Sequence, residues 1–98
     1  MSITTQRERL CCQLCNRQCQ LTFHHLIPRK MHRRAYFKKY YSKAQLQTGV
    51  MLCRLCHKAI HTFYDEMSLA KHLNTLERLL NDSKIQTHLA WVRKQKAL

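Results

Sequence analysis

Residues 50–64 read VMLCRLCHKAIHTFY, and this stretch decides the fold. Its first three residues form a short apolar run, which predicts a strand leading into Cys53. From Cys56 onward, the apolar and histidine positions recur at helical spacing, so a helix is expected to about Tyr64. A strand followed at once by a helix therefore carries two cysteines and two histidines.

Four of the six cysteines form two matching C-x2-C units, Cys12 with Cys15 and Cys53 with Cys56, separated by 37 residues. Each unit lets two thiolates on a tight turn reach one tetrahedral Zn2+, so the pair predicts a structural zinc site. No apolar secretory region opens the chain, which favours metal ligation over disulfides. Cys19 is an alternative to Cys12 as a ligand. Free core cysteines are a second interpretation, and a redox thiol protein is a third, disfavoured because no βαβ pattern is present.

Four of the seven histidines form two tight groups, His24-His25 and His57-x3-His61. The i, i+4 pair places both imidazoles on one helix face, which is half of a metal site. His24 and His25 point to opposite faces of an extended segment, so one can bind a metal while the other acts separately. The competing interpretation is that these histidines complete the zinc shell or lie on the surface.

Upstream of the opening stretch, residues 21–27 favour a strand, which Pro28 ends. Residues 29–47 hold seven Lys and Arg side chains between 29 and 43 and no acid, and they predict short helices or a basic loop. Residues 1–10 are polar and are expected to form a flexible tail.

Downstream, a helix capped by Asp65 or Ser68 is predicted to run to about Leu80, with leucines at helical spacing. A short break follows, and a last helix is expected from about Lys84 to Lys96. These two amphipathic helices of residues 65–98 either cover the metal-bearing part of a single domain or form a homodimer face.

Charge is concentrated in the first two thirds of the chain. The 98 residues carry 18 Lys and Arg against 5 Asp and Glu, a formal charge of +13. Residues 1–64 hold twelve basic side chains and one acid, Glu8. This composition excludes a site built on paired carboxylates there and indicates a polyanionic partner, most simply nucleic acid.

The basic stretch has its own candidate contacts. Its first four basic side chains are expected to bind the nucleic-acid backbone: Arg29, Lys30, Arg33 and Arg34. Aromatic residues interleave with the later ones, and they either stack on bases or pack a helix face: Tyr36, Phe37, Tyr40 and Tyr41.

The combination of C-x2-C, LTFHHLIPRK and LCRLCHKAIH resembles the HNH endonucleases over roughly residues 11–64. The resemblance implies an α+β fold: a small ββα-metal core with a zinc knuckle pair of four cysteines, followed by the two helices. It makes His25 the general base and His24, His57 and His61 the ligands of a catalytic divalent ion. The Asn of the family name is replaced by Thr48, whose carbonyl or hydroxyl is then expected to orient the His25 ring.

The expected activity is therefore metal-dependent hydrolysis of DNA phosphodiester bonds, with a structural Zn2+ and one catalytic Mg2+, Mn2+, Ni2+ or Zn2+. The alternative is a non-catalytic zinc-binding module for DNA or RNA. The chain is expected to be cytoplasmic, to have no membrane partner, and to be a monomer or a homodimer.

Overall fold

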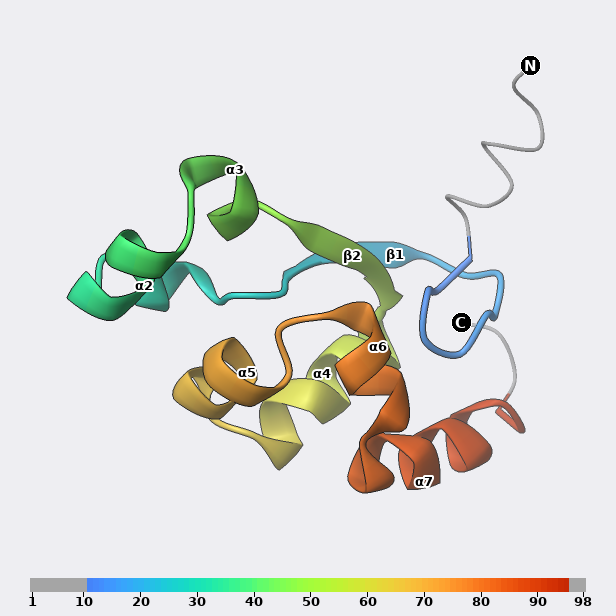
Figure 1. The fold of residues 1–98 in the computed structure, drawn as a ribbon. Coiled ribbons are helices and arrows are strands. Elements are labelled where there is room, and N and C mark those ends of the chain that lie inside the picture. The colour runs from blue at the N-terminus through green and yellow to red at the C-terminus, as the bar shows by residue number, and fades with distance from the viewer. Residues whose placement is uncertain (1–10, 96–98) are drawn as a thin grey trace, which may run out of the picture.

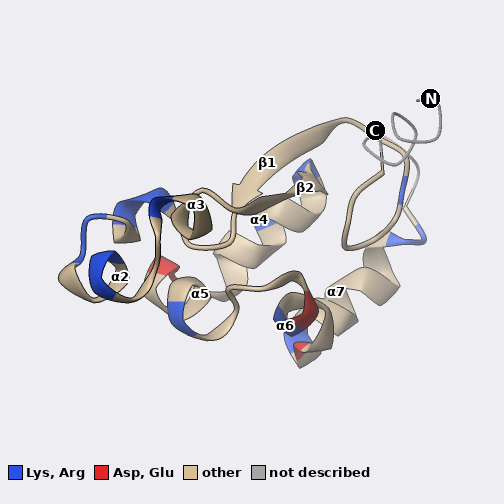
Figure 2. Cartoon of the chain, turned by 45° about the horizontal axis from the view of Figure 1, so that its top comes forward, with Lys and Arg blue, Asp and Glu red and all other residues tan. Residues whose placement is uncertain are grey.

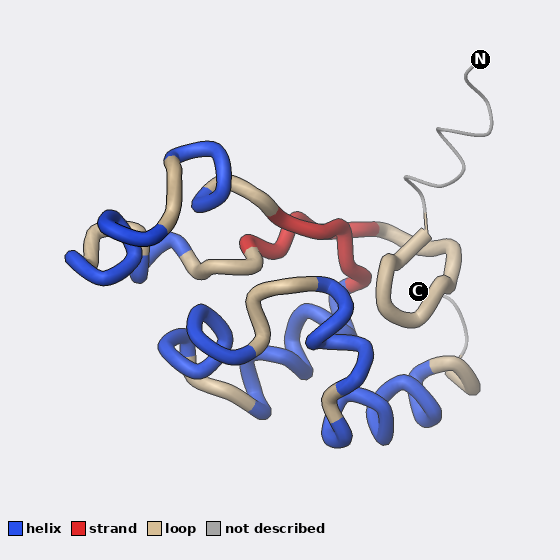
Figure 3. Tube along the Cα trace, viewed as in Figure 1, coloured by secondary structure: helices blue, strands red, loops and turns tan. Residues whose placement is uncertain are grey.

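A β-hairpin forms the centre of the computed structural model, which describes residues 11–95 of the chain (Figure 1). Its strands are β1 (Leu21–His25) and β2 (Gly49–Cys53), paired antiparallel. Helices account for most of the other regular structure, so the chain is a small α+β domain (Figure 3). The tail predicted for residues 1–10 lies outside the described residues.

The register of the hairpin sorts the side chains of β1 onto two faces. Thr22 pairs with Leu52 and His24 with Val50, and the period of two along a strand puts Thr22 and His24 on one face. Phe23 therefore lies on the opposite face. A Cβ on Gly49 would lie 2.5 Å from the backbone carbonyl oxygen of His24 as well as against the Phe23 ring, so close approach of the two strands requires glycine there. The strand ends at His25, three residues before the predicted stop at Pro28.

Helix α4 (Arg54–Phe63) follows β2 without an intervening loop, which confirms the predicted strand-to-helix unit. It begins two residues earlier than expected because Cys53 acts as its N-cap. The Cys53 sulfur accepts a hydrogen bond from the Cys56 backbone N–H at 3.4 Å.

The segment between the strands forms short helices, as one of the two sequence-based alternatives predicted. These are the 3-10 turn η1 (Arg29–Met31), α2 (Ala35–Tyr40) and α3 (Lys43–Leu46). Met31, Phe37 and Leu46 are buried together and form a second, smaller apolar cluster. Figure 1 places α2 and α3 at one end of the molecule, away from the described end of the N-terminal segment.

The prediction of one helix over residues 65–80 is wrong. The chain forms α5 (Glu66–His72) and α6 (Leu76–Asn81) instead. The break arises because the Thr75 hydroxyl accepts from the Arg78 backbone N–H at 3.1 Å and caps a new helix. Asp65 does cap α5, as one alternative proposed.

The last helix, α7 (Ser83–Val92), is shorter than the predicted 84–96. It packs against α4 and α6, and its end is tied to the first cysteine unit by Arg93. The Arg93 guanidinium donates to the carbonyls of Leu14 and Cys15 at 3.2 and 3.4 Å. None of the helices within residues 11–95 is long and apolar enough to cross a bilayer.

Candidate metal centres

Four buried cysteines meet where the hairpin joins α4. The sulfurs of Cys12, Cys15, Cys53 and Cys56 all lie within 4.8 Å of one another, and this group could hold a metal ion. The sulfurs of Cys15 and Cys53 are 3.8 Å apart. A tetrahedron with Zn–S bonds of about 2.3 Å has edges of about 3.8 Å, so the spacing suits tetrahedral thiolate ligation. The choice of Cys12 over Cys19 as the fourth member agrees with this grouping.

The two C-x2-C units have the same local geometry. In each, the backbone N–H of the second cysteine donates to the sulfur of the first, from Cys15 to Cys12 at 3.5 Å and from Cys56 to Cys53 at 3.4 Å. The first unit is a turn closed by the Asn16 N–H bond to the Cys12 carbonyl, and Asn16 takes a left-handed φ of 63°. These N–H groups stabilise negative sulfur, as metal ligation requires.

The thiols share their protons unequally. The hydrogen bond from Cys56 lowers the pKa of Cys12 to about 4, and the same bond, with burial, raises the pKa of Cys56. Burial raises the pKa of Cys15 to about 12. Because a metal binds thiolates, loading this cluster would release protons from Cys15 and Cys56.

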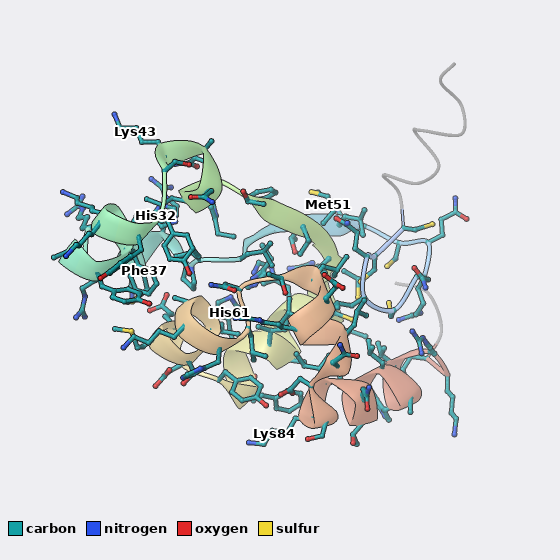
Figure 4. All side chains as sticks on the ribbon, in the orientation of Figure 1. His32, Phe37, Lys43, Met51, His61 and Lys84 are labelled. Carbon is teal, nitrogen blue, oxygen red and sulfur yellow. The ribbon has the colours of Figure 1, made fainter. Side chains whose placement is uncertain are left out.

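Three histidines from β1 and α4 form a second cluster. The ring nitrogens of His24, His57 and His61 lie within 4.8 Å of one another and could also hold a metal ion. The His24 ring centroid is 5.2 Å from that of His57 and 5.4 Å from that of His61. His57 and His61 share one face of α4, as the i, i+4 spacing predicted, and Figure 4 labels His61 near the centre of the fold.

His24 is the buried member of this cluster. Its side chain is 1% exposed, and its Nε2 has no hydrogen-bond partner within the described part of the chain. An unsatisfied buried ring nitrogen costs about 1–3 kcal/mol, a loss that coordination to an ion would offset. Burial, together with His57, His61 and His25, lowers the pKa of His24 to about 4. The ring is therefore neutral at pH 7, as metal ligation requires.

Thr22 determines which nitrogen of His57 is free. The Thr22 hydroxyl donates to the Leu52 carbonyl at 3.1 Å, and its oxygen lies 2.8 Å from Nδ1 of His57. With the hydroxyl proton directed at the Leu52 carbonyl, Thr22 can only accept from His57, and Nδ1 then carries the hydrogen. His57 Nε2 is then the nitrogen with the free lone pair. Sequence reasoning missed Thr22, although its position two residues before His24 puts it on the same strand face.

A surface pocket of about 380 Å³ opens over this cluster. Two of the histidines line it, His57 and His61, together with Thr22, Arg54 and Lys58. The walls thus combine candidate ligands with two exposed cations that can bind an anion. Arg54 and Lys58 were also missed by sequence reasoning, because their role follows only from the helix face they share with His57 and His61.

The structure places His25 apart from the other three histidines. Its half-buried ring makes edge contacts with Phe23 at 4.8 Å and His32 at 5.6 Å between centroids. His32 is itself fixed by a 2.6 Å hydrogen bond from Nε2 to the Ile27 carbonyl. His25 is not among the residues that line the 380 Å³ pocket.

The contact expected between Thr48 and His25 is not formed within residues 11–95. The Thr48 hydroxyl donates to the Ala44 carbonyl at 3.2 Å, and the Thr48 carbonyl accepts from the Leu26 N–H at 3.1 Å. Thr48 lies two residues beyond the end of α3, so its hydroxyl reaches back to the Ala44 carbonyl of that helix. Phe23 and His32 flank the His25 ring instead.

The basic side chains of residues 29–34 form a separate surface. Arg29, Lys30 and Arg33 line a depression of about 330 Å³, and Arg34 precedes α2. Lys30 also forms an exposed 3.5 Å ion pair with Glu66 of α5. Figure 2 shows Lys and Arg positions gathered on α2 and the segment before it.

Comparison of the chain with protein-family models, curated proteins and solved structures gives no match.

Proposed function

We propose that this chain is a metal-dependent DNA endonuclease of the HNH type, built on a ββα-metal core. The observation that carries the proposal is the three-histidine cluster, in which a buried strand histidine with an unpartnered nitrogen meets an i, i+4 pair on the next helix. Three protein ligands with an open pocket are typical of a catalytic ion, whereas the closed group of four cysteines is typical of structural Zn2+.

In this proposal His24, His57 and His61 hold the divalent ion. When bound, such an ion neutralises charge on a phosphate oxygen. Arg54 and Lys58 bind the same phosphate from the pocket wall, because both are exposed cations on the face that carries the ligands. Imidazole ligands suit Zn2+, Ni2+ or Mn2+, and the open positions also admit Mg2+.

His25 accepts the proton of the attacking water in this reaction. It directly follows the ligand His24 and is the last residue of β1, and its ring lies on the Phe23 side of the strand, so its side chain has to turn about the end of the strand to reach a water on the ion. Phe23 and His32 hold the imidazole by packing on its edges, in the place of the expected hydrogen bond from Thr48. Arg29, Lys30, Arg33 and Arg34 supply backbone contacts that do not depend on sequence.

Nicking of supercoiled plasmid by the zinc-loaded full chain tests the proposal. With added Mg2+, Mn2+, Ni2+ or Zn2+, the wild type is expected to convert closed circles to nicked ones. His25→Ala is expected to lose about 10²- to 10⁴-fold in rate while it binds DNA and zinc as before. His72→Ala, an exposed histidine on α5, is the matched control and is expected to cut normally.

A non-catalytic zinc-binding module for DNA or RNA is the second candidate. The absence of a described hydrogen bond to the His25 side chain favours it, because a general base is usually held in one tautomer by such a bond. Wild-type protein that binds plasmid but cuts it with none of the four ions would establish this candidate and exclude the endonuclease.

A further inference from the structure

Helix α2 exposes two aromatic rings and buries a third. Tyr36 is 50% exposed and Tyr40 is 60% exposed, whereas Phe37 is 1% exposed in the second apolar cluster. Tyr41 is half-buried against that cluster. The interleaved aromatics therefore divide, and only Phe37 and Tyr41 are explained by packing.

The two exposed rings form one surface. Tyr36 and Tyr40 are four residues apart, so they share a helix face, and their centroids are 4.9 Å apart at an angle of 48°. Lys39 lies 5.4 Å from the Tyr40 centroid, and Lys71 of α5 lies 5.5 Å from the Tyr36 centroid. We name this surface the tyrosine platform, made of Tyr36, Lys39, Tyr40 and Lys71.

The charged residues on α2 and in its flanking segments are all basic. Residues 29–47 contain no Asp or Glu, so α2 and its flanking segments carry only positive charge. The acid at the start of α5, Glu66, is paired with Lys30. A polyanion is therefore favoured over an acidic-and-basic or purely apolar partner.

Exposed aromatic faces and lysines together fit a nucleotide chain. Bases stack on aromatic rings whatever their identity, while phosphates bind the cations beside them. Paired bases already stack on one another inside a duplex, so only unpaired bases offer free faces to the tyrosines. A basic surface without exposed aromatics would bind single-stranded and double-stranded DNA through the phosphates alone and would not distinguish unpaired from paired bases.

We infer that the tyrosine platform binds unpaired nucleotides, so that the substrate is DNA with a single-stranded segment. This inference names the substrate class of the proposed endonuclease and rests on that function for its biological meaning. Binding itself needs neither His25 nor the divalent ion, so it is measured independently of cleavage.

Fluorescence anisotropy of the zinc-loaded full chain tests the inference, without added divalent ion and at about 0.15 M salt. The probes are a labelled oligo-dT of about 12 nucleotides and a labelled duplex of the same length, within the span that one such surface covers. Each stacked base is worth roughly a 5- to 150-fold change in affinity. The double variant Tyr36→Ala with Tyr40→Ala is therefore expected to lose at least about tenfold for oligo-dT and less than about twofold for the duplex.

Two further variants separate stacking from other causes. Tyr36→Phe with Tyr40→Phe keeps both ring faces and is expected to bind oligo-dT as the wild type does. Trp91→Ala removes an equally exposed ring, at 52%, from α7 and is expected to change neither probe. Thermal unfolding of each variant checks that the fold is retained, which is expected because both tyrosines are exposed.

Three results would overturn the inference. In the first, the double variant Tyr36→Ala with Tyr40→Ala binds oligo-dT like the wild type. In the second, it loses affinity for oligo-dT and for the duplex equally, which would assign the effect to charge or fold. It could also convert a wild-type dimer to a monomer in sedimentation, which would make the platform a contact between copies. If the wild type binds oligo-dT as expected but does not nick plasmid, the result contradicts the proposed endonuclease activity and leaves the inference about the tyrosine platform standing.

Discussion

Replacing Thr22 with Val tests the geometry of the histidine cluster most directly. Valine has the shape of threonine without the hydroxyl, so the half-buried position stays filled. The substitution removes the acceptor 2.8 Å from His57 Nδ1. His57 then has no partner that keeps the hydrogen on Nδ1, and its Nε2 is no longer reserved for the ion.

The expected magnitude follows from that single bond. Loss of a partner behind a metal-binding histidine lowers metal affinity by about 10- to 100-fold. This corresponds to about 1.4–2.7 kcal/mol of binding free energy. The Leu52 carbonyl also loses a hydrogen bond from Thr22, but it belongs to the strand ladder, so the fold is expected to lose only about 1 kcal/mol.

Calorimetric titration of zinc-loaded protein with Ni2+ measures the effect, because Ni2+ favours imidazole and the cysteine cluster is already filled. Long-range 1H–15N NMR correlations of the histidines report separately where His57 carries its hydrogen. Thr62→Val is the matched control. Thr62 is an exposed threonine on α4, the helix that carries His57, and within residues 11–95 its hydroxyl bonds only the Lys58 carbonyl, at 2.8 Å.

The reasoning predicts a Kd for Ni2+ that rises at least about tenfold in Thr22→Val and stays constant in Thr62→Val. An unchanged Kd in Thr22→Val would refute it, as would a wild-type spectrum with the hydrogen of His57 on Nε2. An equal rise of the Kd for Ni2+ in both variants would show that helix α4, and not the hydrogen bond between Thr22 and His57, had been disturbed.

Further predictions concern the other parts of the two clusters. Cys56→Ser is expected to lose the bound zinc and the cooperative thermal transition. Cys11→Ser, outside the four-cysteine group, is expected to keep both. Elemental analysis measures the zinc content and calorimetry measures the thermal transition of each variant. Without added divalent ion, the stability from neutral His24 is complete above about pH 6.5 and is lost as the pH falls toward 4. Between pH 7 and pH 5, the free energy of unfolding in urea should therefore fall by about 2 kcal/mol more in the wild type than in His24→Asn, and equal slopes would contradict this. His32→Ala is expected to lower the nicking rate about tenfold and His32→Phe to restore most of it, because ring packing on His25 is what His32 supplies; an unchanged rate in His32→Ala would remove that role.

The sequence predicted those parts of the fold that depend on local pattern. The strand at residues 50–52, the helix behind it and both C-x2-C turns follow from short-range spacing, and the structure has all of them. The choice of His24, and not His25, as the partner of His57 and His61 came from the resemblance to the HNH endonucleases, and the structure brings these three rings together. Local spacing and the cysteine cluster that the two C-x2-C turns share therefore determine where these turns and the helix after Cys53 lie.

Other features could not be predicted because they depend on tertiary contacts. The break between α5 and α6 is set partly by Asn74, whose amide donates to the Ala70 carbonyl and to the Tyr41 hydroxyl 33 residues away. The surroundings of His25 depend on how η1 folds back to bring His32 against it. The contacts of Asn74 with Tyr41 and of His25 with His32 have no signature in nearby sequence, whereas the Thr75 cap is a local signal that the leucine spacing over residues 65–80 masks.

The two clusters are joined through consecutive residues and through one shared helix. Cys56 belongs to the cysteine group and His57 to the histidine group, and Cys53 caps the helix that carries both His57 and His61. Ligation of the cysteines therefore fixes the start of α4 and with it the direction of both helix histidines. The histidine cluster is tied to the hairpin in turn, because Thr22 bonds both His57 Nδ1 and the Leu52 carbonyl. Under the proposed function, the cysteine group therefore positions the two helix ligands of the histidine site, which suits a structural metal beside a catalytic one.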